Sequence, residues 1–312
     1  MYKGILFALG ACFIWGLIFV VPQFMTGFSS IEVALGRYLF FGIISLCILF
    51  KDKLLGTCNY SISIWIKALY YSLITTIIYY TCLVLALRYS TPAICALVCG
   101  ISPITIAFYG NWKQRECSYK SLIIPSILIL VGLVIINAPQ LMKVESPLEY
   151  GMGLICCFIA LTAWSWYVVA NSHLLRENPH LISSDWSTLL GVSTLFWVGF
   201  FGIFLAVFFS EKIDMQKYYT LDSALTNFLI GCSILGLVCS WLGSYLWNRA
   251  SHYLPVSLAG QLTIFETIFG LSFVYTLEQR MPPQMECVGI SLLLGAVIYG
   301  IRSSSHAAPQ HA

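Results

Sequence analysis

Ala11–Val20 reads A-C-F-I-W-G-L-I-F-V, and Ala160–Val169 reads A-L-T-A-W-S-W-Y-V-V. Three residues recur at the same spacing in the two stretches: Ala11, Trp15 and Val20 in the first, and Ala160, Trp164 and Val169 in the second. A pattern that returns once, about half a chain later, indicates an internal duplication. We therefore expect the 312 residues to contain two related halves.

Two further echoes follow in the same order. An acidic residue opens the second apolar stretch of each half, Glu32 in the first and Asp185 in the second. Later in each half, an Ala-x-basic-Tyr segment precedes a proline: Ala86–Tyr89 before Pro92, and Ala250–Tyr253 before Pro255. Proline suits the first turn of a helix, where its missing N–H has no helical partner. Each match is weak alone, but three in one order support the duplication.

The composition places the chain in a membrane. Hydrophobic residues make up 59% of the sequence, charged residues only 9%, and the mean hydropathy is +0.85. A bilayer core requires about 20 apolar residues per helix. Nine further stretches follow the first, so we do not expect a cleaved signal peptide. The predicted spans are 4–24, 30–50, 64–87, 91–112, 119–137, 151–171, 183–209, 224–248, 254–277 and 284–301.

Five spans per half is an odd number, so the second half must insert upside down relative to the first. The predicted fold is an all-α polytopic membrane protein of ten transmembrane helices arranged as two inverted five-helix repeats. The N-terminal repeat covers 1–140, a linker 141–150, the C-terminal repeat 151–302 and a polar tail 303–312. Two inverted repeats are typical of carriers with a substrate site near the membrane midplane.

The basic residues predict the orientation. With Met1 in the cytoplasm, the inner side carries Lys3, Lys51, Lys53, Lys67, Lys113, Arg115, Lys120, Arg176, Arg249 and Arg302. The outer side carries only Arg88, Lys143, Lys212, Lys217 and Arg280. Lys and Arg concentrate in cytoplasmic loops. We expect a multi-pass protein of the cytoplasmic (inner) membrane with both termini in the cytoplasm.

Twelve cysteines do not change this interpretation. Ten of them fall within or beside the apolar spans, where free cysteine behaves as a small hydrophobe. Cys58 and Cys117 fall in loops predicted to face the reducing cytoplasm. The sequence has no C-x-x-C and no Cys/His pair at zinc spacing. We expect packing cysteines, no metal and no cofactor.

Two ionisable residues lie inside predicted spans. Glu266 falls near the middle of the ninth span, where a charge costs roughly 2.5–3.5 kcal/mol on insertion scales and often marks a pathway or proton site. It is our candidate for proton coupling, and a permanently protonated, hydrogen-bonded Glu is the alternative. Arg37 lies in the second span and has three alternatives: pairing with Glu32, snorkelling to the interface, or binding an anionic group of the substrate. Asp185 is expected to be a helix-start acid.

Small polar and aromatic residues supply the other candidates. The eighth span carries a stripe at i, i+4 spacing that could let helices approach closely or could form a cavity wall: Cys232, Gly236, Ser240, Ser244 and Asn248. Tyr79 and Tyr80 lie too deep to belong to an interfacial belt. Trp15, Trp164 and Trp166 are similarly deep and either pack or contact a substrate. The candidate wall residues are Trp15, Tyr79, Tyr80, Trp164, Ser244 and Asn248.

The sequence resembles the EamA-type ten-helix members of the drug/metabolite transporter superfamily. The resemblance covers essentially the whole chain and is carried by Trp15-Gly16, Arg37-Tyr38, Tyr245–Ala250, Leu254–Gly260, and Glu266 followed by a helix that ends near Leu277-Glu278. Such exporters often have Pro after the Glu of the ninth span. Here Thr267 stands in that place, which gives less reason to expect a kink, whereas the first half keeps Ser102-Pro103.

The resemblance implies a secondary-active transporter that works by alternating access. Four helices of each half would surround a central cavity, with the fifth and tenth spans peripheral. The expected substrate is a small metabolite such as an amino acid, moved outward. The alternatives are uptake or exchange of a larger metabolite, such as a nucleoside or a methyl-donor cofactor, and drug efflux.

An enzyme or a channel is less expected. The sequence has no H-E-x-x-H, D-D-x-x-D, G-x-S-x-G or P-loop motif, and no filter or ring of charge of the kind that channels use. The expected partners are the small-molecule substrate, protons and the lipid bilayer, without nucleic acid. The expected assembly is a monomer or a weak dimer.

Overall fold

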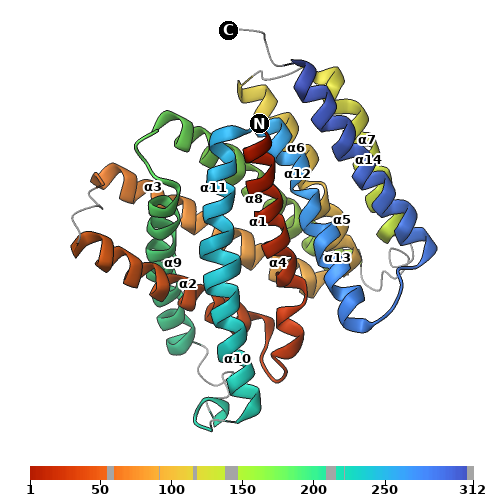
Figure 1. Cartoon of the computed structure of the whole chain (residues 1–312). Helices are drawn as coiled ribbons and strands as arrows, with labels where there is room; N and C mark the ends of the chain where they lie inside the picture. The colour runs from red at the N-terminus through yellow and green to blue at the C-terminus, as the bar shows by residue number, and fades with distance from the viewer. Residues whose placement is uncertain are drawn as a thin grey trace.

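The computed structural model describes residues 1–54, 60–90, 92–114, 118–137, 147–208, 216–220 and 222–307. Ten of its helical segments are long and apolar enough to cross a membrane. They run Tyr2–Phe24, Ser30–Asp52, Ile62–Tyr89, Cys95–Lys113, Tyr119–Asn137, Tyr150–Glu177, Ser183–Ile203, Ser223–Tyr253, Val256–Glu278 and Gln284–Arg302. The ten-helix prediction is confirmed. An even number of crossings brings Met1 and the end of the tenth span to one side (Figure 1), which we call the terminal side, opposite the distal side.

Several spans are composed of more than one helical segment. The first half contains α1 (Tyr2–Gly16) with η1 (Leu17–Phe19) and η2 (Val21–Phe24), α2 (Ser30–Leu54), α3 (Ile62–Ser72) with η3 (Leu73–Ile78) and α4 (Tyr79–Tyr89), α5 (Pro92–Gly100) with α6 (Ser102–Gln114), and α7 (Tyr119–Asn137). The second half contains α8 (Pro147–Glu177), α9 (Ser183–Phe208), η6 (Gln216–Tyr218), α10 (Ser223–Ser233) with η7 (Ile234–Leu242) and α11 (Gly243–Tyr253), α12 (Val256–Leu262) with α13 (Ile264–Glu278), and α14 (Gln284–Ala307).

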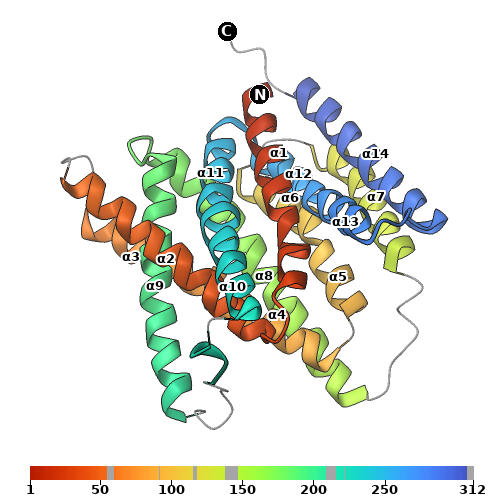
Figure 2. The ribbon, with the colours of Figure 1, turned by 60° about the horizontal axis from the view of Figure 1, so that its bottom comes forward.

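Each span of the first half packs most extensively against a span of the second half. The first packs on the eighth, the second on the seventh, the third on the sixth, the fourth on the ninth and the fifth on the tenth. Exchanging the halves maps this set of pairs onto itself, as two equivalent repeats require. The fifth and tenth spans, α7 and α14, lie together at one edge of the molecule (Figures 1 and 2). The inversion of the repeats stays a prediction.

The interruptions of the spans also match between the halves. The third and eighth spans each contain a π-helical segment, η3 and η7. The fourth span breaks at Ile101, between α5 and α6, and the ninth breaks at Thr263, between α12 and α13. Thr263 donates its backbone N–H and its hydroxyl to Gly260 O, which tightens the chain into a turn. The ninth span is therefore interrupted without the proline that its sequence lacks.

Small residues allow the second and seventh spans to approach closely. A Cβ at Gly191 would lie 1.9 Å from Ser45 Oγ and 2.6 Å from Ser45 Cβ, and one at Gly42 would lie 2.4 Å from Leu195 Cβ. In lipid, where burial of apolar surface no longer favours helix association, this close packing holds helices together.

The ends of two predicted regions differ from the structure. The linker was expected to reach residue 150, but α8 begins at Pro147, where proline fits the first helical turn. The polar tail was expected from residue 303, but α14 continues to Ala307, because extending an existing helix is easier than starting one. Residues 141–146 and 308–312, and the loop positions Cys58 and Cys117, lie outside the described residues.

The packing of α2 on α9 predicts a difference between two glycines of α9. Gly191→Ala is expected to lower the free energy of unfolding by about 1–3 kcal/mol, because its Cβ must displace Ser45. Gly199→Ala is the matched control, since its Cβ would meet no atom within 4 Å and alanine favours the helix by up to about 1 kcal/mol. Thermal unfolding in detergent compares them. Equal effects of both variants would contradict this account of the interface.

Candidate functional site: a cavity between the two halves

A cavity of about 560 Å³ lies at the centre of the bundle. Spans one to nine contribute to its wall, the fifth only through Leu133, Ile136 and Asn137. The wall extends to the distal ends of the spans at Leu87, Asn137 and Val274. Toward the terminal side it stops at Tyr167, Leu190, Trp247 and Thr263, well inside the bundle. The cavity is therefore open toward the distal side and closed toward the termini.

Aromatic rings form the closed end of the cavity. Trp15 lies 6.0 Å from Trp164 and 5.4 Å from Trp247 between ring centroids. Trp164 in turn contacts Tyr79 at 5.5 Å and Tyr167 at 5.7 Å. Trp15 is fixed across the interface between halves, because its indole N–H donates to Cys239 O at 2.9 Å. This layer offers flat, apolar faces to a ligand entering from the distal side.

Glu266 and Arg37 are the charged residues among the described side chains that line the cavity. Glu266 lies in the first turn of α13, immediately after the break in the ninth span. The N-terminus of a helix carries a partial positive charge, which favours a carboxylate there. The Arg37 guanidinium donates from Nε to Ser240 Oγ at 2.9 Å and lies 5.4 Å from the Tyr38 ring centroid.

A second half-helix also begins at the cavity. Ser102 and Pro103, at the start of α6, line the wall after the break in the fourth span. Thr105, one turn further, shares a 2.6 Å hydrogen bond with Ser165 of α8. Two discontinuous helices at matching positions in the two halves of a membrane protein are typical of a central binding site.

The acidic residues that open the second and seventh spans lie away from the cavity. Glu32 is paired with Lys217 at 2.6 Å and accepts from Tyr218 Oη at 2.7 Å. The alternative that pairs Arg37 with Glu32 is therefore wrong. Asp185 is a helix-start acid, as expected, and accepts from Tyr60 Oη at 2.6 Å.

Seven of the eight predicted substrate-contacting residues line the cavity: Trp15, Arg37, Tyr79, Tyr80, Trp164, Ser244 and Glu266. Asn248 does not, which corrects the prediction that it is a wall residue. It is fully buried, accepts from Asn171 Nδ2 and donates to Ser187 Oγ, both at 2.9 Å. Ser244 and Asn248 lie one turn apart in the same regular helix, α11, but the cavity wall stops at Trp247, so Asn248 lies beyond the closed end of the cavity.

The structure adds wall residues that the sequence argument did not select. Tyr167 is one turn after Trp164 and could have been found from that spacing. Trp247 lies within the stretch that carried the family resemblance. The Ser102-Pro103 break could have been recognised as an interruption of an apolar span, as could the polar Thr263 in the ninth. Trp166, by contrast, faces away from the cavity, where its ring meets Tyr70 edge-to-face and Tyr71 at a tilt.

Three comparisons place this geometry among known proteins. Residues 2–138 match the model of the EamA-like transporter family. The chain is 29% identical to the inner membrane protein YtfF of Escherichia coli (strain K12) over 310 residues, covering 97% of this chain and 96% of that one. A solved structure, titled only as the crystal structure of a protein, superposes with a TM-score of 0.78 at 14% identity, covering 99% of this chain and 100% of that one. The last match shows a shared fold.

The buried hydrogen bonds of Asn248 predict that its loss reduces stability. Asn248→Ala leaves Asn171 Nδ2 and Ser187 Oγ without this partner in a buried site, so it should lower the free energy of unfolding by about 1–3 kcal/mol. Ser244→Ala, one turn earlier and facing the cavity, is the control and should change stability by less than about 1 kcal/mol. Thermal unfolding in detergent provides the measurement. An Asn248→Ala protein of unchanged stability would restore Asn248 as a wall candidate.

Proposed function

We propose that this chain is a secondary-active carrier that exports small metabolites such as amino acids. It belongs to the EamA-like transporter family of the drug/metabolite transporter superfamily and spans the inner membrane many times. The observation that carries the proposal is the central cavity, which combines an aromatic layer with one guanidinium and one carboxylate among its described residues. Transport would proceed by alternating access, with the termini in the cytoplasm.

The cavity chemistry favours a zwitterionic or neutral solute. Arg37 can bind a carboxylate by charge-assisted hydrogen bonds, and the aromatic layer can pack against an apolar side chain. A multiply charged substrate would need several cations, whereas Arg37 is the one cationic side chain of the described wall. A cavity of about 560 Å³ is also large enough for a nucleoside, so exchange of a larger metabolite is the second candidate.

Glu266 is the proposed proton-coupling residue. Its place at the N-terminus of α13 stabilises the ionised form, while the surrounding hydrocarbon favours the protonated form. A carboxyl group balanced in this way can load a proton when the cavity faces one side and release it when the cavity faces the other. Substrate and proton would then bind alternately in the one cavity that Glu266 and Arg37 both line.

The first test of this role is counterflow in proteoliposomes with a panel of labelled amino acids. The wild type should show saturable counterflow of a subset of the panel, with a rate that depends on pH. Glu266→Gln should retain exchange but lose the pH dependence, because the amide does not titrate. If Glu266→Gln keeps the rate and pH profile of the wild type, Glu266 is not the proton site. Absence of flux for every amino acid, in folded protein, would move the assignment to nucleosides, methyl donors or drugs.

Arg37 has a separate test. Arg37→Gln is expected to raise the half-saturating concentration of a carboxylate substrate about tenfold or more, because a hydrogen bond to a charged group contributes about 1.5–3 kcal/mol. The methyl ester of the same amino acid should be affected much less. Arg280→Gln is the control, since Arg280 is paired with Glu278 at the surface. Equal losses for acid and ester would show that Arg37 supports the cavity without binding the carboxylate.

A further inference from the structure

Two short turns join helices at opposite faces of the membrane. The turn after Tyr89 links the third and fourth spans on the distal side, and the turn Tyr253–Pro255 links the eighth and ninth on the terminal side. Both are the Ala-x-basic-Tyr segments that the sequence duplicates. They lead into the two broken spans that line the cavity, so a movement of either broken span relative to the span before it bends one of these turns.

Each turn packs on a glycine of the opposite half. A Cβ at Gly4 would lie 2.7 Å from both Leu254 Cγ and Tyr253 Cβ, and one at Gly153 would lie 2.7 Å from Ser90 Cβ. These glycines are 153 − 4 = 149 positions apart, the separation of Trp15 and Trp164, 164 − 15 = 149. They are equivalent sites in the two halves. At each site the missing side chain lets a turn pack directly on the helix backbone.

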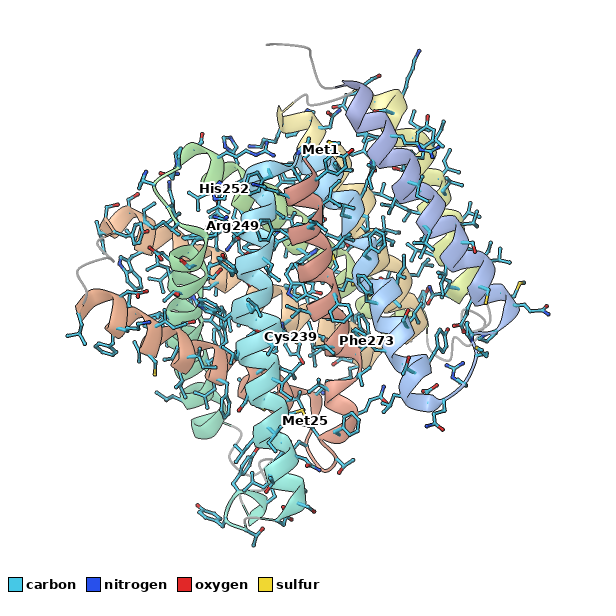
Figure 3. The ribbon with its side chains drawn as sticks, in the orientation of Figure 1. Met1, Met25, Cys239, Arg249, His252 and Phe273 are labelled. Carbon is cyan, nitrogen blue, oxygen red and sulfur yellow. The ribbon has the colours of Figure 1, made fainter. Side chains whose placement is uncertain are left out.

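The terminal-side turn also has a polar attachment to the sixth span. Arg176, in the last turn of α8, donates from Nε to Ser251 O at 3.3 Å and from Nη2 to Leu254 O. Ser251 and Leu254 are buried. The final carbonyls of a helix lack helical partners and carry partial negative charge, so a guanidinium satisfies both needs there. Figure 3 shows this end of α11, with Arg249 and His252, beside Met1.

The distal turn is attached to the sixth span through a thiol instead: Cys157 of α8 hydrogen-bonds the Ser90 side chain, and its Sγ donates to Cys95 Sγ at 3.6 Å. A thiol is a weak hydrogen-bond donor, whereas the hydrogen bonds of a guanidinium are charge-assisted and stronger. The cavity wall correspondingly extends to Leu87 and Cys95 on either side of that turn, whereas on the terminal side it stops at Trp247.

The geometry points to Arg176 as the latch of the terminal-side gate: it holds the turn between the eighth and ninth spans against the sixth, and the cavity opens to that side when its two hydrogen bonds break. This inference rests on the alternating access proposed above. The latch explains why the described state is open distally, since the thiol contacts that hold the distal turn are weaker than the hydrogen bonds of the Arg176 guanidinium. Loss of hydrogen bonds to a charged group should shift the balance between the two states by about ten- to a hundredfold.

Hydrogen–deuterium exchange of the protein in lipid nanodiscs tests the latch without a substrate. In Arg176→Gln, backbone amides around Tyr253–Leu262 should exchange about tenfold faster or more as that side opens. Amides around Leu83–Gly100 should become protected to a similar extent as the distal side closes. His173→Ala is the matched control: it is one turn earlier on α8, pairs with Glu177 and makes none of the described contacts with the turn. It should leave both regions unchanged.

The reciprocal change separates a latch from simple support of the fold. Faster exchange at the terminal turn without protection at the distal turn would overturn the inference, as would no change at either. If Arg176→Gln does not fold, Arg176→Lys keeps the charge but loses the fork of donors, and it should give the same reciprocal pattern at smaller amplitude. Counterflow in wild-type protein is measured separately, so a failed latch with intact counterflow leaves the proposed carrier standing.

Discussion

The structure depends on one constraint: a backbone group in hydrocarbon must find its hydrogen-bond partner within the protein or in a water-filled space. Most of each span meets it as a continuous helix. The described interruptions at Ile101 and Thr263 are tolerated because both adjoin the central cavity. The π-helical segments η3 and η7 likewise border it, through Thr75, Thr76 and Ser240. The irregular backbone segments therefore occur where the candidate site lies, at the central cavity.

Because the breaks occur at the cavity, they also determine its electrostatics. A helix that restarts in mid-membrane brings free N–H groups and partial positive charge to that point. Glu266 occupies one such position, and the start of α6 provides the other. Arg37, held by Ser240, adds a full positive charge across the cavity. The wall can therefore accept negative charge at several points, while its aromatic layer remains apolar.

The span boundaries could be predicted closely from sequence because the bilayer thickness fixes a length that apolar residues must match. Trp15, Trp164 and Glu266 could be selected because large aromatic or ionisable groups are unusual at that depth. The burial of Asn248 could not be predicted, because the cavity closes at Trp247, and the tertiary packing of the aromatic rings determines that depth. The partner of Arg37 was equally hidden, because Ser240 is distant in sequence and Glu32 is near.

The pairing of spans across the halves has a consequence for biosynthesis. Ribosomes deliver the first five spans while all five partners are still unmade, so α2 enters the membrane with Gly42 and Ser45 facing lipid until α9 arrives. The last span, α14, is the partner of α7, which has then waited for half of the translation time. Assembly is consequently a late event, completed as the C-terminal end inserts. Until then the nascent chain is a set of individually stable helices that await association rather than a folded half-protein.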